Sequence, residues 1–326
     1  MEHVICVNYN NCILNFGRAH SKYKKRTILA KEETVNKIGI HFGYFNKDWE
    51  TDFFKQITQV KRLGFDILEI APDAMMRRTE SERQRIAEFA SENDISLTFS
   101  VGLAARYDLA SENDEIRKAG IDYTIQALKI MNQMKIKMYS GVDYGAWNTT
   151  FTEKISDKRP AWERSLKSIR KIMKTAEELD ITYAVEVVNR YEQGLLNTAE
   201  EAVEYVKQAD SPNIKILLDT YHMNIEEDDF SEAIHTAGRY LAHFHVGEAN
   251  RKPPSLNGRM PWEEITGALK DISYDGAIVM EPFIKMGGEV GRDIKVWRDI
   301  SKGADEAEME EMVRNSIHML RQKMAQ

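Results

Sequence analysis

The chain has 326 residues, of which 42% are hydrophobic, and it carries a formal net charge of −7 at pH 7. This negative balance disfavours a nucleic-acid partner, because proteins that bind phosphate backbones usually present a basic stripe. No window approaches the roughly 18 consecutive apolar residues of a membrane span. The 2 cysteines allow neither a disulfide framework nor a cysteine-rich zinc site. These totals favour a cytoplasmic protein that binds small molecules.

Residues 1–34 differ from the rest of the chain. A short mixed run, VICVNYNNCILNF, precedes a basic patch, and neither shows a helical or strand period. A secretory signal has the reverse order, with positive charges before the apolar segment. We therefore expect residues 1–34 to be a leader outside the fold, disordered or foreign to the native protein, and residues 35–326 to form the folded domain.

From residue 37 onward, short apolar runs alternate with amphipathic stretches, which is typical of repeated βα units in a parallel sheet. The expected strands cover residues 38–44, 67–71, 96–101, 137–140, 182–187, 214–218, 241–245 and 276–280. The expected helices lie near residues 50–63, 79–93, 113–135, 159–179, 198–209, 229–237, 261–272 and 304–324. Eight such units predict a (β/α)8 TIM barrel, and the lack of a Pro- or Ser-rich linker predicts a single domain.

Four consecutive predicted strands carry a charged or imidazole side chain near their carboxyl ends. Glu186 interrupts the run YAVEVV, Asp219 ends KILLD, His245 lies in AHFHVGE, and Glu281 follows IVM. The carboxyl ends of the strands carry the chemistry of a TIM barrel, and neighbouring strands lie only about 4.8 Å apart. A single polar residue of this kind is often just hydrogen-bonded within a core, but four in consecutive strands indicate a shared site.

We expect these four residues to bind one divalent metal ion. Three carboxylates and one imidazole suit manganese, magnesium or cobalt better than a structural zinc ion, which prefers sulfur and nitrogen ligands. His243 points to the same side of its strand as His245, because side chains alternate along a strand. Since His245 is nearer the carboxyl end, we expect it to be the ligand and His243 to pack behind it or in the interior.

Polar residues also follow the proposed ligands. Glu192, His222 and Arg251 come six, three and six residues after a proposed ligand, so we place them in the loops that surround the same pocket. Together they offer hydrogen-bond donors and acceptors suited to a ligand rich in hydroxyl groups. Trp147, in the loop GVDYGAW after the fourth strand, is the aromatic residue that we expect to line the apolar side of the pocket.

The chain resembles the ketose 3-epimerases, a family that includes D-tagatose 3-epimerase and D-allulose (psicose) 3-epimerase. The resemblance rests on the stretches GFDILEI, YAVEVVNRYEQ, NTAEEAV, LLDTYHMNIEE, HFHVGEANR, MPWEEI, YDGAIVMEPF and IKVWRDIS, which extend from about residue 37 to the last helix. It implies a TIM barrel with one divalent ion, usually Mn²⁺ and otherwise Mg²⁺ or Co²⁺. It also implies a homodimer or homotetramer, and reversible inversion at C3 of a free ketose, as between D-tagatose and D-sorbose or D-fructose and D-allulose.

The resemblance also implies roles for individual residues. The matching positions make Glu186, Asp219, His245 and Glu281 the metal ligands, and Glu192, His222 and Arg251 the substrate contacts. Inversion at C3 requires one group that removes a proton and another that returns a proton to the opposite face. We expect Glu186 and Glu281 to be this pair, with a cis-enediolate of the sugar between the two proton transfers.

Two positions depart from the family pattern. The chain has Phe45 where many members have Trp, and Asn148 where Pro is expected, both near the expected far end of the sugar. The preferred sugar therefore stays open.

Other functions remain possible on the same fold. The nearer alternatives are a sugar isomerase and an inosose dehydratase. A nuclease resembling endonuclease IV would need more than these 8 histidines and a basic rim. A barrel that only binds sugar would leave two buried glutamates without a function.

Overall fold

The computed structural model describes residues 36–149 and 157–325. The expected leader, residues 1–34, lies outside the described residues. None of the helices in the described ranges is long and apolar enough to cross a membrane.

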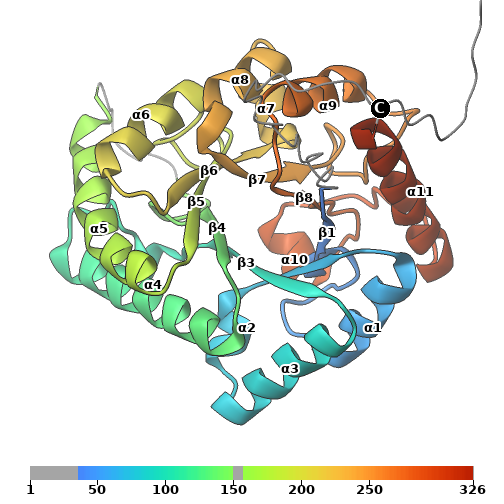
Figure 1. Ribbon diagram of the computed structural model, residues 1–326, viewed down its shortest axis with the longest axis horizontal. Helices are drawn as coiled ribbons and strands as arrows, with labels where there is room; N and C mark the ends of the chain where they lie inside the picture. The colour runs from blue at the N-terminus through green and yellow to red at the C-terminus, as the bar shows by residue number, and fades with distance from the viewer. Residues whose placement is uncertain (1–35, 150–156, 326) are drawn as a thin grey trace, which may run out of the picture. The chain divides into compact units, whose positions relative to one another are not determined.

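Eight parallel strands close into a barrel in which each strand pairs with the next in sequence and β1 pairs with β8 (Figure 1). The strands are β1 Ile38–His41, β2 Ile67–Ile70, β3 Ser96–Gly102, β4 Met138–Val142, β5 Thr182–Val187, β6 Ile214–Asp219, β7 Leu241–Val246 and β8 Ala277–Met280. Their residues are almost entirely buried, as expected for strands covered by helices on one face and packed against each other inside the barrel. The predicted TIM barrel and its single domain are therefore confirmed.

The helices surround the barrel on its outside (Figure 1). The longer ones are α1 Phe53–Leu63, α3 Glu80–Glu92, α4 Asp114–Met134, α5 Arg159–Glu178, α6 Ala199–Ala209, α8 Phe230–Ala237, α9 Trp262–Asp271 and α11 Glu306–Ala325. Local signals fix several of their ends. Thr198 caps α6 by accepting a hydrogen bond from the backbone N–H of Glu201, and Gly64 ends α1 with a left-handed φ of 94°.

Three short helices were not predicted, and each follows a strand end: α2 Pro72–Met76, α7 Thr220–Glu226 and α10 Gly288–Asp293. They have 5, 7 and 6 residues, so no hydrophobic period could develop within them. One prediction changes as a result. His222, which we expected in a loop, lies in α7.

Candidate active site

The four predicted metal ligands meet at the carboxyl ends of β5 to β8. Glu186 lies in β5, Asp219 ends β6, His245 lies in β7, and Glu281 directly follows β8. The parallel register sets Asp219 beside His245, and the backbone N–H of Glu281 donates to the carbonyl of Val246. These four side chains each provide one ligand atom, and the four atoms lie within 4.8 Å of one another.

The donor set fits a divalent cation. All four residues are buried, with exposed fractions of 6% for Glu186, 1% for Asp219, 0% for His245 and 9% for Glu281. Neither ring nitrogen of His245 has a hydrogen-bond partner among the described residues, and Nδ1 lies 3.9 Å from Oε1 of Glu186 and 3.7 Å from Oε2 of Glu281. An orphaned ring nitrogen that faces buried carboxylates is the arrangement that an oxygen- and nitrogen-binding ion such as Mn²⁺ satisfies.

Arg251 neutralises part of the negative charge. Its Nη1 donates to Oδ2 of Asp219 at 2.8 Å and to Oε2 of Glu281 at 2.7 Å. Its backbone is left-handed, with a φ of 61°, which is uncommon outside glycine. Hydrogen bonds to the backbones of Glu248 and Phe283 hold this turn in place. Three carboxyl groups thus share one guanidinium, and a divalent cation would balance the charge of those that ionise.

The two glutamates of the site differ in their acidity. Burial raises the pKa of Glu186 well above its usual value, and the nearby charge of Glu281 raises it further. Burial also opposes ionisation of Glu281, but Arg251 and His245 outweigh it and lower the pKa of that carboxyl. Before any ion binds, the pair therefore favours one neutral and one charged carboxyl, as expected for two acids too close to ionise together.

His222 is held in one tautomer beside Glu186. Its Nδ1 accepts hydrogen bonds from the backbone N–H of Asn189 at 3.1 Å and from the Asn189 side-chain amide at 2.8 Å. The backbone donor of Asn189 places the ring proton on Nε2, which lies 3.6 Å from Oε1 of Glu186 and 3.3 Å from Nη2 of Arg251. Because burial lowers the pKa of His222, the ring is a neutral hydrogen-bond donor at the pocket.

Glu192 and Trp147 are bonded to each other. The indole N–H of Trp147 donates to Oε2 of Glu192 at 2.9 Å, and the side chain of Asn189 donates to Oε1 at 3.0 Å. Burial opposes the charge of Glu192, but His222, Arg251 and these hydrogen bonds lower its pKa overall. Glu192 is therefore an ionised acceptor fixed from both sides.

The proposed substrate contacts surround one cavity of about 630 Å³. Its lining includes both glutamates of the metal cluster and all four predicted substrate contacts, namely Glu186, Glu281, Trp147, Glu192, His222 and Arg251. A cavity of this size is within the usual range for small-molecule sites, about 300 to 1,000 Å³. The side chains that we singled out from the sequence are thus brought together, while their roles in binding and catalysis stay predictions.

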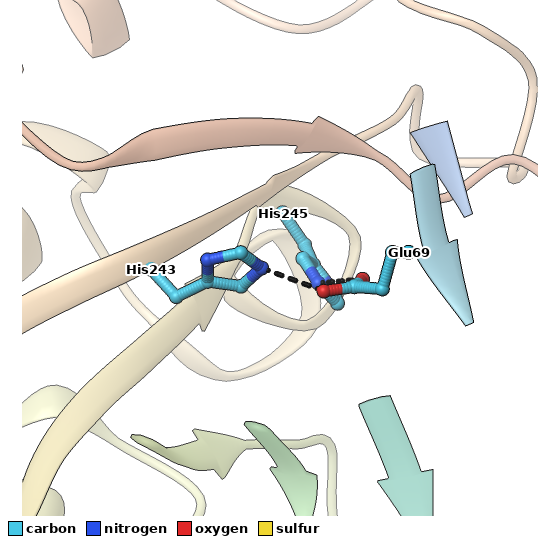
Figure 2. Close-up of side chains that lie close together, drawn as sticks. All are labelled: Glu69, His243 and His245. Carbon is cyan, nitrogen blue, oxygen red and sulfur yellow. Dashed lines mark hydrogen bonds and ion pairs between the residues drawn. The ribbon is translucent and has the colours of Figure 1, made fainter. Parts of the chain in front are cut away.

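Glu69 was not predicted from the sequence, although it lies in the stretch GFDILEI. Glu69 is in β2 and is fully buried. One of its carboxylate oxygens lies 2.8 Å from Nε2 of His243 and the other 2.8 Å from Nε2 of His245 (Figure 2). Burial opposes its charge, but the two imidazoles hold the pKa of Glu69 well below its usual value. An acid flanked by apolar residues in a buried strand was the available signal, the same one that drew attention to Glu186.

Comparisons with known proteins place the chain in a family. Residues 57–311 match the family described as xylose isomerase-like TIM barrel. A D-psicose 3-epimerase of Ruminiclostridium cellulolyticum is 46% identical over 83% of this chain and 92% of the relative, and one of Agrobacterium fabrum is 42% identical over 86% and 96%. The crystal structure of a D-psicose 3-epimerase with D-tagatose from Clostridium cellulolyticum has a TM-score of 0.86 and 43% identity, and the match covers 88% of this chain and 99% of that chain. The chain therefore belongs to the xylose isomerase-like TIM-barrel family and, within it, to the ketose 3-epimerases, a group of carbohydrate isomerases.

Proposed function

We propose that the protein inverts C3 of free ketoses with the help of one divalent ion. We expect this ion to be Mn²⁺, with Mg²⁺ or Co²⁺ as alternatives. The substrate pairs are D-fructose with D-allulose (D-psicose) and D-tagatose with D-sorbose. One observation supports this proposal most strongly. The buried Glu186 and Glu281 belong to the same candidate metal-binding group, and both line the cavity. The names of the relatives support the substrate class.

The mechanism needs two carboxylates on opposite faces of C3. A bound divalent ion would polarise the ketone and make the C3 proton more acidic. Glu186 or Glu281 then removes this proton, and the other glutamate returns one to the opposite face of the cis-enediolate of the sugar. The configuration of the starting sugar decides which glutamate acts first. Both carboxyl groups are buried, which limits their contact with bulk water.

The remaining polar residues bind and orient the sugar. Nε2–H of His222 and the guanidinium of Arg251 donate to sugar oxygens, while the ionised Glu192 accepts from a hydroxyl group. All three are held by other side chains or by the backbone before the sugar arrives. Their positions are therefore set in advance, which reduces the entropy lost on binding.

The reaction can be tested in D₂O. The protein with Mn²⁺ should convert D-allulose, D-fructose, D-tagatose or L-ribulose into the C3 epimer and introduce deuterium at C3, as measured by chromatography and NMR. Deuterium enters at C3 because the proton returned to the sugar comes from a carboxyl that exchanges with solvent. An aldose product would indicate a sugar isomerase instead. Epimerisation of no ketose, with no exchange at C3, would contradict the proposal.

Replacing Trp147 by Phe should weaken sugar binding without stopping the chemistry. The change removes the indole N–H that holds Glu192 and leaves the aromatic ring. A net contribution of about 1 kcal/mol for such a hydrogen bond corresponds to a KM about fivefold higher, with kcat little changed. Steady-state kinetics would check this. Trp297→Phe is the matched control, since Trp297 is 71% exposed. A fall in kcat at unchanged KM for Trp147→Phe would contradict a role in binding.

A further inference from the structure

Glu69 connects the proposed metal site to the opposite side of the barrel. It lies in β2 and its side chain reaches across the interior to β7, where Nε2 of His245 is 2.8 Å from Oε1 and Nε2 of His243 is 2.8 Å from Oε2 (Figure 2). Thr98, in the neighbouring β3, donates its hydroxyl to Oε2 at 2.9 Å. Glu69, His243 and His245 are each 0% exposed.

A carboxylate in this position needs donors. Burying a charge without partners is strongly unfavourable. In the described part of the chain, Oε2 of Glu69 is hydrogen-bonded to Nε2 of His243 and to the hydroxyl of Thr98. Oε1 lies 2.8 Å from Nε2 of His245, an ion-pair distance at an angle that is poor for a hydrogen bond. Each nitrogen can satisfy the carboxylate only by carrying a proton. The contact therefore favours the tautomers of His243 and His245 that have the proton on Nε2.

The tautomer of His245 decides whether it can bind an ion. A neutral imidazole has one N–H and one lone pair. With the proton on Nε2, the lone pair is on Nδ1, which is the nitrogen that faces Glu186 and Glu281. With the proton on Nδ1, that face would present a hydrogen to the ion.

We propose that Glu69 is the positioning residue of the metal site: it keeps the proton of His245 on Nε2 and so presents Nδ1 to the ion. His243 and Thr98 hold the second oxygen of Glu69 and fix the carboxylate plane. This inference rests on the proposed metal-dependent function. It also assigns a task to His243, which is to anchor Glu69 and not to bind the catalytic ion.

A second metal ion between Glu69, His243 and His245 is the competing explanation, because these three residues also form a compact donor group. The hydrogen bond of 2.8 Å between Nε2 of His243 and Oε2 of Glu69 needs a proton, which an ion bound there would displace. The group offers three protein donors, and all three residues are 0% exposed. Water could therefore not readily complete the coordination of an ion there, and a single ion at the four-residue site fits the geometry better.

The test is the affinity of the Glu69→Gln protein for Mn²⁺, read from the EPR signal of free Mn²⁺ and from calorimetry. Gln keeps the size of Glu69 but brings an amide N–H toward one of the two imidazoles. Loss of such a support typically weakens metal binding about 10- to 100-fold, and we expect that loss with one ion per chain in the wild type. The Co²⁺ absorption spectrum should change as well, because the ligand geometry changes.

Thr98→Val is the milder companion variant. It removes one hydrogen bond to Glu69 and keeps the charge, so Mn²⁺ affinity should fall by less than in Glu69→Gln. The metal-free Glu69→Gln variant could melt at a lower temperature than the metal-free wild type and yet bind Mn²⁺ as tightly as the wild type. In that case Glu69 has only a structural role, and the proposal fails. Two ions per wild-type chain would favour the second metal site and would also overturn it.

A measurement on the wild type does not depend on any variant folding. In protein labelled with ¹⁵N-histidine and loaded with diamagnetic Mg²⁺, NMR should show the proton of His245 on Nε2, and a proton on Nδ1 would overturn the proposal. The two proposals also fail separately. If the wild type binds no divalent ion, the proposed function is wrong. If the wild type binds the ion and epimerises ketoses, but Glu69→Gln binds Mn²⁺ as tightly as the wild type, only this inference is wrong.

Discussion

Replacing either Glu186 or Glu281 by Gln is expected to lower kcat for ketose epimerisation by about 10²- to 10⁴-fold, the usual contribution of a general acid or base. An amide cannot exchange a proton with C3, so inversion stops even when the sugar binds. Both glutamates are also proposed ligands, and therefore kcat should be measured at a Mn²⁺ concentration that saturates each variant. Glu50→Gln is the control, since Glu50 lines the same cavity but bonds to Arg77 and Arg78 at its edge.

The two variants should differ in one measurable way. If each glutamate serves one face of C3, the variant that keeps only Glu281 can still exchange the C3 proton of one epimer with solvent, and the variant that keeps only Glu186 can exchange that of the other. Residual deuterium exchange, followed by NMR with both epimers of one ketose, should show this opposite preference. Near-normal turnover in either variant would show that inversion does not need two carboxylates.

Removing divalent ions with a chelator should abolish epimerisation and lower the melting temperature. Without an ion, the carboxyl groups of Glu186, Asp219 and Glu281 face Arg251 and the imidazoles of His222 and His245. A ligand that binds the folded state at 100 times its Kd stabilises it by about 2.7 kcal/mol. For a chain of this size, this corresponds to a shift of several degrees, which calorimetry can detect.

Adding Mn²⁺ back should restore both activity and melting temperature, and Mg²⁺ or Co²⁺ should do so in part. Asp219→Asn provides the matched comparison, because its melting temperature should respond less to Mn²⁺. Activity that survives complete chelation, verified by elemental analysis, would contradict the metal-dependent reaction.

The sequence was sufficient for the barrel because each strand is short, buried and followed by a helix. β5 was predicted with the bounds Thr182–Val187 that the structure shows, and the other strand ends differ by no more than three residues. Parallel strands that are covered on both sides are apolar throughout, so an acid such as Glu186 is conspicuous within one. The candidate ligands could be predicted for the same reason, together with the rule that barrel chemistry lies at the carboxyl ends.

Contacts between distant parts of the chain could not be predicted in this way. Glu69 and His243 are 174 positions apart in sequence, and nothing near either residue indicates the other. The bonds from Arg251 to Asp219 and Glu281 likewise depend on a left-handed turn after β7. Helix α7 was missed because its 7 residues are too few for a hydrophobic period, although Asp219 caps it by accepting at Oδ1 from the backbone N–H of Tyr221.

The cavity has two unequal walls, and this has an evolutionary consequence. On the side of β5 to β8, the ionisable groups are tied to one another, so a single exchange there disturbs several partners. On the side of β1 to β3, the lining includes Trp49, Pro72, Val101, Leu103 and Ala104, whose side chains lie outside the carboxylate cluster. If the protein acts on ketoses as proposed, we expect natural selection or a laboratory library to alter the range of sugars through the second wall and to leave the proposed proton-transfer groups of the first wall unchanged.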